Sequence, residues 1–183
     1  MNGASIPNGY RLEHLSRDHP RKQFTCGETR VDDWIWTKAL QNQEKHLSAT
    51  KVLLDSSSAI AGFYTLAMSE VEFDAAPDDV RRRLPQRRLP VALLAWLGVS
   101  ASHQGQGLGG RLFSMALRDC YEAGKAFPFV ALVIDCVSDS SLAFFQKWDL
   151  TQADQHPRRL FLSAKRLDAM MKYGPSQLGA EGE

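Results

Sequence analysis

Four glycines within six residues form a segment whose chemistry suits an anion. The segment reads Gln104-Gly105-Gln106-Gly107-Leu108-Gly109-Gly110, between an apolar run and an amphipathic one. Glycine adopts positive φ readily and lets backbone N–H groups approach a ligand closely. The segment leads directly into the start of an expected helix, where unpaired N–H groups and the helix dipole favour negative charge. We therefore predict that this loop binds a pyrophosphate.

The spacing of the glycines leaves three interpretations of the loop. A dinucleotide-binding G-x-G-x-x-G motif fits Gly105, Gly107 and Gly110, but such a motif usually lies in the first βαβ unit, with an acidic residue about 20 positions later. A P-loop requires a lysine directly after the glycines, and none is present. The third interpretation is a tight turn without a ligand. The loop lies past the middle of the chain, after an expected hairpin, which disfavours the dinucleotide motif.

The elements around the loop can be read from the spacing of apolar residues. Residues 91–99 are almost continuously apolar, which is typical of a strand buried on both faces. A core-facing helix follows, because apolar residues recur at helical spacing, namely Leu108, Leu112, Phe113, Ala116, Leu117 and Cys120. Residues 129–137 predict a second buried strand. Ser138 is a suitable N-cap for a further helix that carries Leu142, Phe145 and Trp148.

The rest of the chain completes a β-α-β-β-β-α-β-α-β order. This order predicts one α/β domain, with a mixed sheet and helices on its faces. Trp34 and Trp36 cannot both face the core of one helix, so one of them is expected to be exposed. The remaining predicted elements are a strand at 10–15, a helix from Cys26–Thr29 toward Leu40, strands at 51–55 and 59–68 joined by the turn 55–58, a loop at 74–90 with a short helix at 78–84, a strand at 159–163 and a helix at 164–172.

Composition limits the classes of protein that fit. The chain has 183 residues, 44% hydrophobic and 23% charged, with a net charge of +1, so overall charge favours neither a nucleic-acid nor a membrane partner. Three widely spaced cysteines form neither a disulfide framework nor a zinc motif, which favours a reducing, cytoplasmic location. No histidine has metal-ligand spacing, and there is no membrane-length apolar run. The first residues have neither a basic start nor an apolar run, so we do not expect a signal peptide. Residues 1–8 and 175–183 are expected to be frayed tails.

At the glycine loop the sequence resembles the GNAT superfamily of N-acetyltransferases. The coenzyme A loop of that family reads Gln/Arg-x-x-Gly-x-Gly/Ala, which Gln104, Gly107 and Gly109 match. The resemblance implies acetyl-CoA as the cofactor and a GNAT fold with two splayed parallel strands, the ends of which hold the pantetheine arm. The cofactor-binding residues that it implies are Leu97, Gly98, Val99, Gln104, Gly105, Gln106, Gly107, Leu108, Gly109, Gly110 and Ser138.

From about residue 10 to 165 the chain is more specifically similar to the GNAT toxins of bacterial toxin–antitoxin pairs. The similarity rests on the segments 24–28, 40–43, 61–66 and 94–99, with the helix of Trp34. Those toxins acetylate the α-amine of aminoacyl-tRNA, and their partner is a small ribbon-helix-helix antitoxin. The resemblance implies the same substrate and partner here, and a homodimer is left open. Two rivals remain, an acetyltransferase for small molecules or proteins outside any toxin system and a catalytically silent GNAT-fold binding module.

Two residues depart from the toxin pattern. The toxins carry a tyrosine in an Ala-Phe-Tyr segment, which protonates the departing thiolate, whereas this chain reads Ala143-Phe144-Phe145. Phe145 therefore stands at the position of the general acid and cannot donate a proton. The strand before the loop often carries an arginine where this chain has Trp96, which weakens a transfer of the RNA contacts.

The loss of a general acid has four interpretations. Such an acid contributes roughly 10²–10⁴-fold in rate, yet a thiol with a pKa of about 8.5 leaves tolerably without one. An α-amine with a pKa of about 7.7–8.0 is partly neutral at pH 7 and needs little help from a base. Activity could therefore survive at a lower rate, or another donor such as Tyr64 or Ser138 could serve. Phe145 could also be an inactivating substitution, or plain core packing.

Two further groups of polar residues have open interpretations. Five arginines occur within eight residues. They form either a surface for RNA phosphates or a solvated loop whose charge is balanced by Glu70, Glu72, Asp74, Asp78 and Asp79. The resemblance to the toxins favours RNA. His103, beside the glycine loop, is either a cofactor contact or an exposed side chain. The five arginines are Arg81, Arg82, Arg83, Arg87 and Arg88.

Overall fold

The computed structural model describes residues 5–174 as two compact parts, which are taken in turn. The first part comprises residues 5–67 and 94–117, and the second part comprises residues 68–93 and 118–174. Residues 1–4 and 175–183, which include most of the expected tails, lie outside the described residues. In residues 5–174 no helix has the length and apolar character to cross a membrane.

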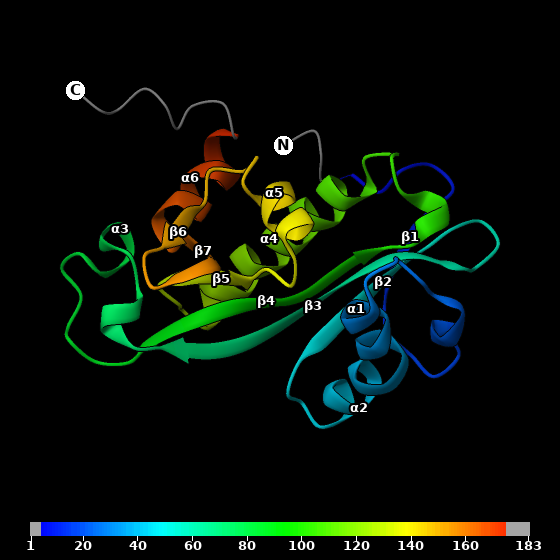
Figure 1. Cartoon of the computed structure of the whole chain (residues 1–183), viewed down its shortest axis with the longest axis horizontal. Coiled ribbons are helices and arrows are strands. Elements are labelled where there is room, and N and C mark those ends of the chain that lie inside the picture. The colour runs from blue at the N-terminus through cyan, green and yellow to red at the C-terminus, as the bar shows by residue number, and fades with distance from the viewer. Residues whose placement is uncertain (1–4, 175–183) are drawn as a thin grey trace. The chain divides into compact units, whose positions relative to one another are not determined.

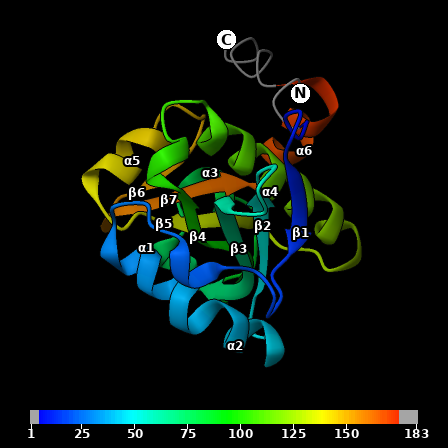
Figure 2. The ribbon, with the colours of Figure 1, turned by 90° about the vertical axis from the view of Figure 1, so that its right-hand side faces the viewer.

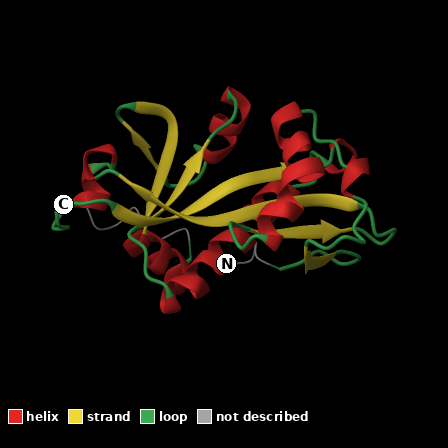
Figure 3. Cartoon of the chain, turned by 90° about the horizontal axis from the view of Figure 1, so that it is seen from below, coloured by secondary structure: helices red, strands yellow, loops and turns green. Residues whose placement is uncertain are grey.

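The strands form one seven-stranded sheet in the order β1-β2-β3-β4-β5-β7-β6, which confirms the predicted mixed α/β class (Figure 1). The sequence predicted six strands. The additional one is β6 (Thr151–Ala153), which pairs antiparallel with β7 (His156–Ser163). A strand of three residues is too short to show a period of two, so the sequence pattern missed it. Figure 3 distinguishes the strands from the helices by colour.

In the first part, β1 (Arg11–His14) pairs antiparallel with β2 (Ala49–Leu54), and β2 pairs antiparallel with β3 (Ile60–Val71). Figure 2 shows β1 beside β2. The predicted turn between β2 and β3 is present. Asp55 closes it, because its carboxylate accepts hydrogen bonds from the backbone N–H groups of Ser57 and Ala59 at 2.8 and 3.0 Å. This is the local role in which aspartate favours turns.

The predicted N-terminal helix is divided into three segments. After a short 3₁₀ turn at Arg21–Gln23, α1 (Thr29–Asp33) continues as a π-helical segment (34–38) and then as α2 (Ala39–Glu44). The expectation that one tryptophan is exposed is wrong. Trp34 and Trp36 are both half-buried, and both indole N–H groups are bonded, to the Thr65 hydroxyl at 3.1 Å and to the Phe24 carbonyl at 2.7 Å. A π-helical segment departs from the regular helical spacing on which the expectation rested.

The glycine loop lies between β4 (Leu89–Val99) and α4 (Leu108–Ala126), as predicted, with a 3₁₀ turn at 101–103. The apolar face of α4 enters the core, where Leu112 and Phe113 are fully buried. The prediction that the strand is buried on both faces holds for its start but is wrong for its end. Trp96, Leu97 and Val99 are only half-buried.

The second part packs a helix-and-loop segment and two strands around a core of its own. Val80 of α3 (Asp78–Arg81), Val133 of β5 (Ala131–Asp135) and Phe161 of β7 belong to this core. A 3₁₀ turn (Phe73–Ala75) precedes α3, and α6 (Ala164–Tyr173) follows β7.

Two helices of the second part are shorter than predicted. α3 ends at Arg81 rather than Leu84, because Arg82 has an extended ψ of 124° and Arg83 a left-handed φ of 66°. α5 (Asp139–Phe145) ends at Phe145, so Trp148 lies in the following turn, where its N–H bonds to the Phe145 carbonyl.

Two glycines of the first part lie where side chains would crowd, and we predict different costs for filling them. A Cβ at Gly62 would lie 2.6 Å from Leu112 Cδ1 and 2.9 Å from the Gly98 carbonyl oxygen, whereas a Cβ at Gly98 would meet three side chains, the nearest Val31 at 2.9 Å. Side chains can shift, but a strand carbonyl cannot shift without distorting the sheet. Gly62→Ala should therefore lower the free energy of unfolding by about 1–3 kcal/mol, and by more than Gly98→Ala. Urea unfolding of both variants measures this, and an equal or reversed order would contradict it.

Candidate active site

The backbone of the glycine loop explains why glycines are needed in it. Gly105 and Gly107 have φ of 76° and 75°, in the left-handed region that disfavours other residues. A Cβ at either position would meet nothing within 4 Å, so the requirement is conformational rather than steric. Gly109 and Gly110 then form the first turn of α4, where N–H groups have no intrahelical acceptor. Such a helix start can hold a phosphate group through its backbone.

The side chains of the loop contribute less than its backbone. Leu108 is 3% exposed, so its side chain packs in the core and only its backbone can face a ligand. The Gln104 side chain donates from Nε2 to the carbonyl oxygens of Cys26 and Val99, at 2.8 and 3.0 Å. The amide N–H groups of Gln104 are therefore already used within the protein.

The end of β4 was predicted to pair with the pantetheine arm through Leu97, Gly98 and Val99. The Val99 carbonyl already accepts a hydrogen bond from Gln104, and Ser100 N donates to the Ala61 carbonyl at 2.8 Å. Gly98 is buried against Val31, Phe63 and Phe24. Pairing of this strand with the cofactor stays a prediction, and so does the splay of two neighbouring strands.

His103 is tied to the turn between β2 and β3 rather than exposed. Its Nε2 lies 3.3 Å from Asp55 Oδ2, its Nδ1 lies 2.9 Å from the Ser102 hydroxyl, and its side chain is 17% exposed. The Ser57 hydroxyl, two backbone N–H groups and His103 lower the pKa of Asp55. The sequence could not reveal this pair, because Asp55 was recognised only as a turn residue. The interpretation of His103 as an exposed side chain was wrong.

Trp96 stacks on Trp34 within the first part. The ring centroids are 5.2 Å apart and the planes are inclined by 18°. The two rings come from β4 and from the π-helical segment, so this contact links the strand before the glycine loop to the N-terminal helix. Nothing in the spacing of these two residues predicts it.

The second part contains Phe145 and Ser138. Ser138 caps α5 as predicted, because its hydroxyl accepts from Ser141 N at 3.2 Å and Ser138 N donates to the Ser141 hydroxyl at 3.0 Å. Phe145 is the last residue of α5, is 5% exposed and meets the Phe144 ring edge-on at 4.9 Å. Of the two alternative donors, Tyr64 is 1% exposed, and the hydroxyl of Ser138 is engaged in the cap.

All three thiols are held in the neutral form. Burial raises the pKa of Cys26 and Cys120 to about 12 and that of Cys136 to about 11. Because a thiolate is the nucleophilic form of cysteine, none of these residues is suited to form a covalent acyl intermediate near neutral pH. The described residues also contain no group of three or more His, Cys, Asp or Glu side chains that could hold a metal ion.

Two of the five loop arginines are paired with carboxylates. Arg81 donates from Nε to Asp78 at 2.8 Å and lies over the Phe73 ring, and Arg88 bonds to Glu70 and Glu72. The balanced-loop interpretation is therefore correct for these two.

Arg82, Arg83 and Arg87 have no ion-pair partner among residues 5–174. One acid that was expected to balance them, Asp79, instead accepts from Thr151 at 3.0 Å and lies 3.7 Å from Arg166. The loop thus carries three guanidiniums that remain available to phosphates.

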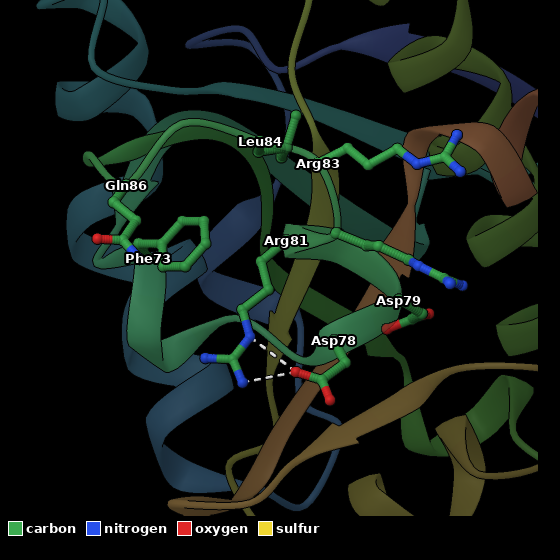
Figure 4. Close-up of a pocket in the computed structure, with 8 residues that line it drawn as sticks. Phe73, Asp78, Asp79, Arg81, Arg83, Leu84 and Gln86 are labelled. Atoms are coloured by element: carbon green, nitrogen blue, oxygen red, sulfur yellow. Dashed lines mark hydrogen bonds and ion pairs between the residues drawn. The ribbon is translucent and has the colours of Figure 1, made fainter.

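A hollow of about 620 Å³ is lined by Arg82 and Arg83, but not by Arg87. Figure 4 shows the Arg81 side chain turned back to Asp78, whereas Arg83 extends away from the Phe73 ring. Arg83 has a φ of 66°, in the left-handed region, so the loop holds this arginine in an unfavourable backbone conformation. The lining residues are Phe73, Asp78, Asp79, Arg81, Arg82, Arg83, Leu84 and Gln86.

Comparison with known proteins places the chain in a family. No family model matches it, but it is 32% identical over 171 residues to a tRNA-acetylating toxin of Mycobacterium tuberculosis, and the match covers 93% of this chain and 99% of the toxin. The chain belongs to the GNAT tRNA-acetylating toxins. The family resemblance noted at the glycine loop is thereby confirmed.

Solved structures of GNAT toxins have the same fold. AtaT complexed with acetyl-methionyl-tRNAfMet matches with a TM-score of 0.80 at 21% identity, over 88% of this chain and 99% of AtaT. A tyrosine-to-phenylalanine mutant of AtaT, bound to the C-terminus of the antitoxin AtaR and acetyl-CoA, matches with a TM-score of 0.76 at 20% identity, over 90% of this chain and 99% of that one. These likenesses confirm the predicted GNAT fold.

Proposed function

We propose that this protein is an acetyl-CoA-dependent toxin that acetylates the α-amine of aminoacyl-tRNA in the cytoplasm and thereby blocks translation. The observation that carries the proposal is the near full-length identity of 32% to a toxin named for acetylating tRNA. The open start of α4, reached through the left-handed glycines, supplies a site for the cofactor pyrophosphate. A tyrosine-to-phenylalanine mutant of AtaT is bound to acetyl-CoA and the C-terminus of the antitoxin AtaR in one solved complex, and we extend both kinds of partner to this chain.

The reaction proposed is direct transfer. The neutral amine attacks the thioester carbonyl and forms a carbon–nitrogen bond. The carbon–sulfur bond breaks, coenzyme A leaves as the thiolate with the bonding electrons, and the proton lost by the amine passes to water or to that thiolate. The neutral state of the three thiols supports transfer without an acyl-enzyme. An α-amine suits a site without a strong base, because with a pKa of about 7.7–8.0 it is partly neutral at pH 7.

The cofactor site can be tested by charge at Gly107. The φ of 75° penalises any side chain, but Asn and Asp tolerate left-handed backbone better than other residues. Gly107→Asn therefore measures the cost of the side chain, and Gly107→Asp adds a negative charge that should repel a pyrophosphate. We expect calorimetry with acetyl-CoA to show at least about tenfold weaker binding for Gly107→Asp than for Gly107→Asn. Equal affinities of the two variants would show that the pyrophosphate does not bind at this loop.

The position of the general acid can be tested by restoring a hydroxyl. If Phe145 occupies that position, Phe145→Tyr should raise turnover with acetyl-CoA and charged tRNA, toward the roughly 10²–10⁴-fold that a general acid supplies. Phe144→Tyr adds a hydroxyl to the adjacent, half-buried ring and is the matched control.

The same assay separates the outcomes. No gain at unchanged acetyl-CoA affinity would mean that the chain uses another donor or none. Bound acetyl-CoA without turnover in parent and variant would favour a silent binding module, for which Phe145 is the specific argument. Turnover on a small amine or a protein, without growth arrest on induction, would favour the other rival.

The arginine loop can be tested by the salt dependence of tRNA binding. The arginines without a carboxylate partner, Arg82, Arg83 and Arg87, are the better candidates for binding phosphates. Replacing all three by glutamine should weaken binding and reduce the slope of log K against log salt by about 0.7–0.9 for each phosphate that is no longer neutralised. Replacing the paired Arg81 and Arg88 should change the slope less. Fluorescence titrations at several salt concentrations measure both, and an unchanged slope in the triple variant would exclude this loop as the RNA surface.

A further inference from the structure

Three consecutive carbonyl groups in the irregular segment 24–26 are each held by a donor from outside the segment. The Phe24 carbonyl accepts from the Trp36 indole at 2.7 Å, and the Thr25 carbonyl accepts from Ala101 N at 2.8 Å. The Cys26 carbonyl accepts from Gln104 Nε2 at 2.8 Å. A segment without regular secondary structure must find partners for its backbone groups elsewhere. This segment finds two of the three between β4 and α4.

The amide of Gln104 is fully committed as a donor. A primary amide has two N–H groups, and they account for the bonds to the Cys26 and Val99 carbonyls. The remaining polar atom, Oε1, is an acceptor and offers nothing to a phosphate oxygen. The side chain of Gln104 is thus suited to hold protein backbone, whereas the backbone of the glycine loop is suited to hold an anion.

Asp32, in α1, also binds the same segment. Asp32 is 5% exposed, and its carboxylate accepts from Cys26 N at 2.8 Å and from the Thr25 hydroxyl at 3.0 Å. A buried carboxylate destabilises a fold unless it is hydrogen-bonded. Its two bonds therefore tie residues 25 and 26 firmly to α1.

We propose that Gln104 is a positioning residue for acetyl-CoA binding, which fixes the glycine loop by fastening it, through residues 24–26, to Asp32 at the start of the N-terminal helix. The cofactor meets the loop backbone, and Gln104 acts on it only through that backbone. This inference rests on the proposed acetyl-CoA site and adds a role that differs from direct contact between the Gln104 side chain and the cofactor.

The first test removes the donors and keeps the shape. Gln104→Met should weaken acetyl-CoA binding about three- to tenfold, because two solvent-exposed neutral hydrogen bonds are removed, while kcat at saturating acetyl-CoA stays within about twofold. Gln104→Arg restores several donors and should recover most of the affinity. Gln23→Met is the matched control, because Gln23 is exposed and directly precedes the segment.

The second test asks whether Gln104 and Asp32 act on one segment. Asp32→Asn keeps one acceptor and loses the other, so it should also weaken acetyl-CoA binding although Asp32 is buried within the protein. Residues that act through a shared element give non-additive effects. The double variant should therefore bind acetyl-CoA almost as tightly as whichever single variant binds it more weakly. Unchanged affinity in Asp32→Asn, or additive effects, would overturn the proposal in favour of direct contact by Gln104.

Hydrogen exchange on the ligand-free protein tests the link between Gln104 and Asp32 independently of cofactor binding. Gln104→Met and Asp32→Asn should both speed exchange in residues 24–28 and 100–107, relative to Gln23→Met. Faster exchange in both variants, together with a parent that does not bind acetyl-CoA, would reject the proposed function but retain the link between Gln104, residues 24–26 and Asp32. Unchanged exchange, or a parent that binds acetyl-CoA measurably but no more tightly than Gln104→Met, would reject the inference and leave the proposed function intact.

Discussion

The structure of the first part depends on the constraint that the start of α4 stays open. An unpaired helix start must be matched by water, a side chain or an anion. Here the preceding residues are two left-handed glycines rather than a capping side chain. The close approach of α4 to the sheet depends on a third glycine, because Leu112 occupies the space that a Cβ of Gly62 would need. The position and the openness of this helix start thus both come from the absence of side chains.

The residues that lead into the start of α4 are held by hydrogen bonds and an ion pair to other segments of the first part. The 3₁₀ turn before the loop is tied through His103 to Asp55, and Gln104 is tied to Cys26. Both partners come from segments more than forty residues earlier in the chain. Glycine gives the loop backbone many accessible conformations, and these long-range contacts restrict the residues at the start of the loop.

These long-range contacts are also the features that the sequence could not predict. The loop, the strand and helix beside it and the Ser138 cap were predictable, because each depends on residues within a few positions of one another. The partners of Gln104, His103 and Trp96 were not, because a hydrogen bond or ring stack between distant segments leaves no period in the sequence. The same limit applies to the arginines, since the count of acids near them did not reveal that Asp79 is bonded to Thr151 instead.

The difference between paired and unpaired arginines changes how the net charge of +1 should be understood. An exposed ion pair contributes little to stability, but it cancels the local field that would attract a phosphate. Arg81 and Arg88 are cancelled in this way, whereas Arg82, Arg83 and Arg87 are not matched by a carboxylate within residues 5–174. A chain that is nearly neutral overall can therefore still present a basic surface. Arg83 is held there in left-handed backbone at a cost in conformational energy, and with Arg82 and Arg87 it leaves on this loop a local positive field that can attract a polyanion.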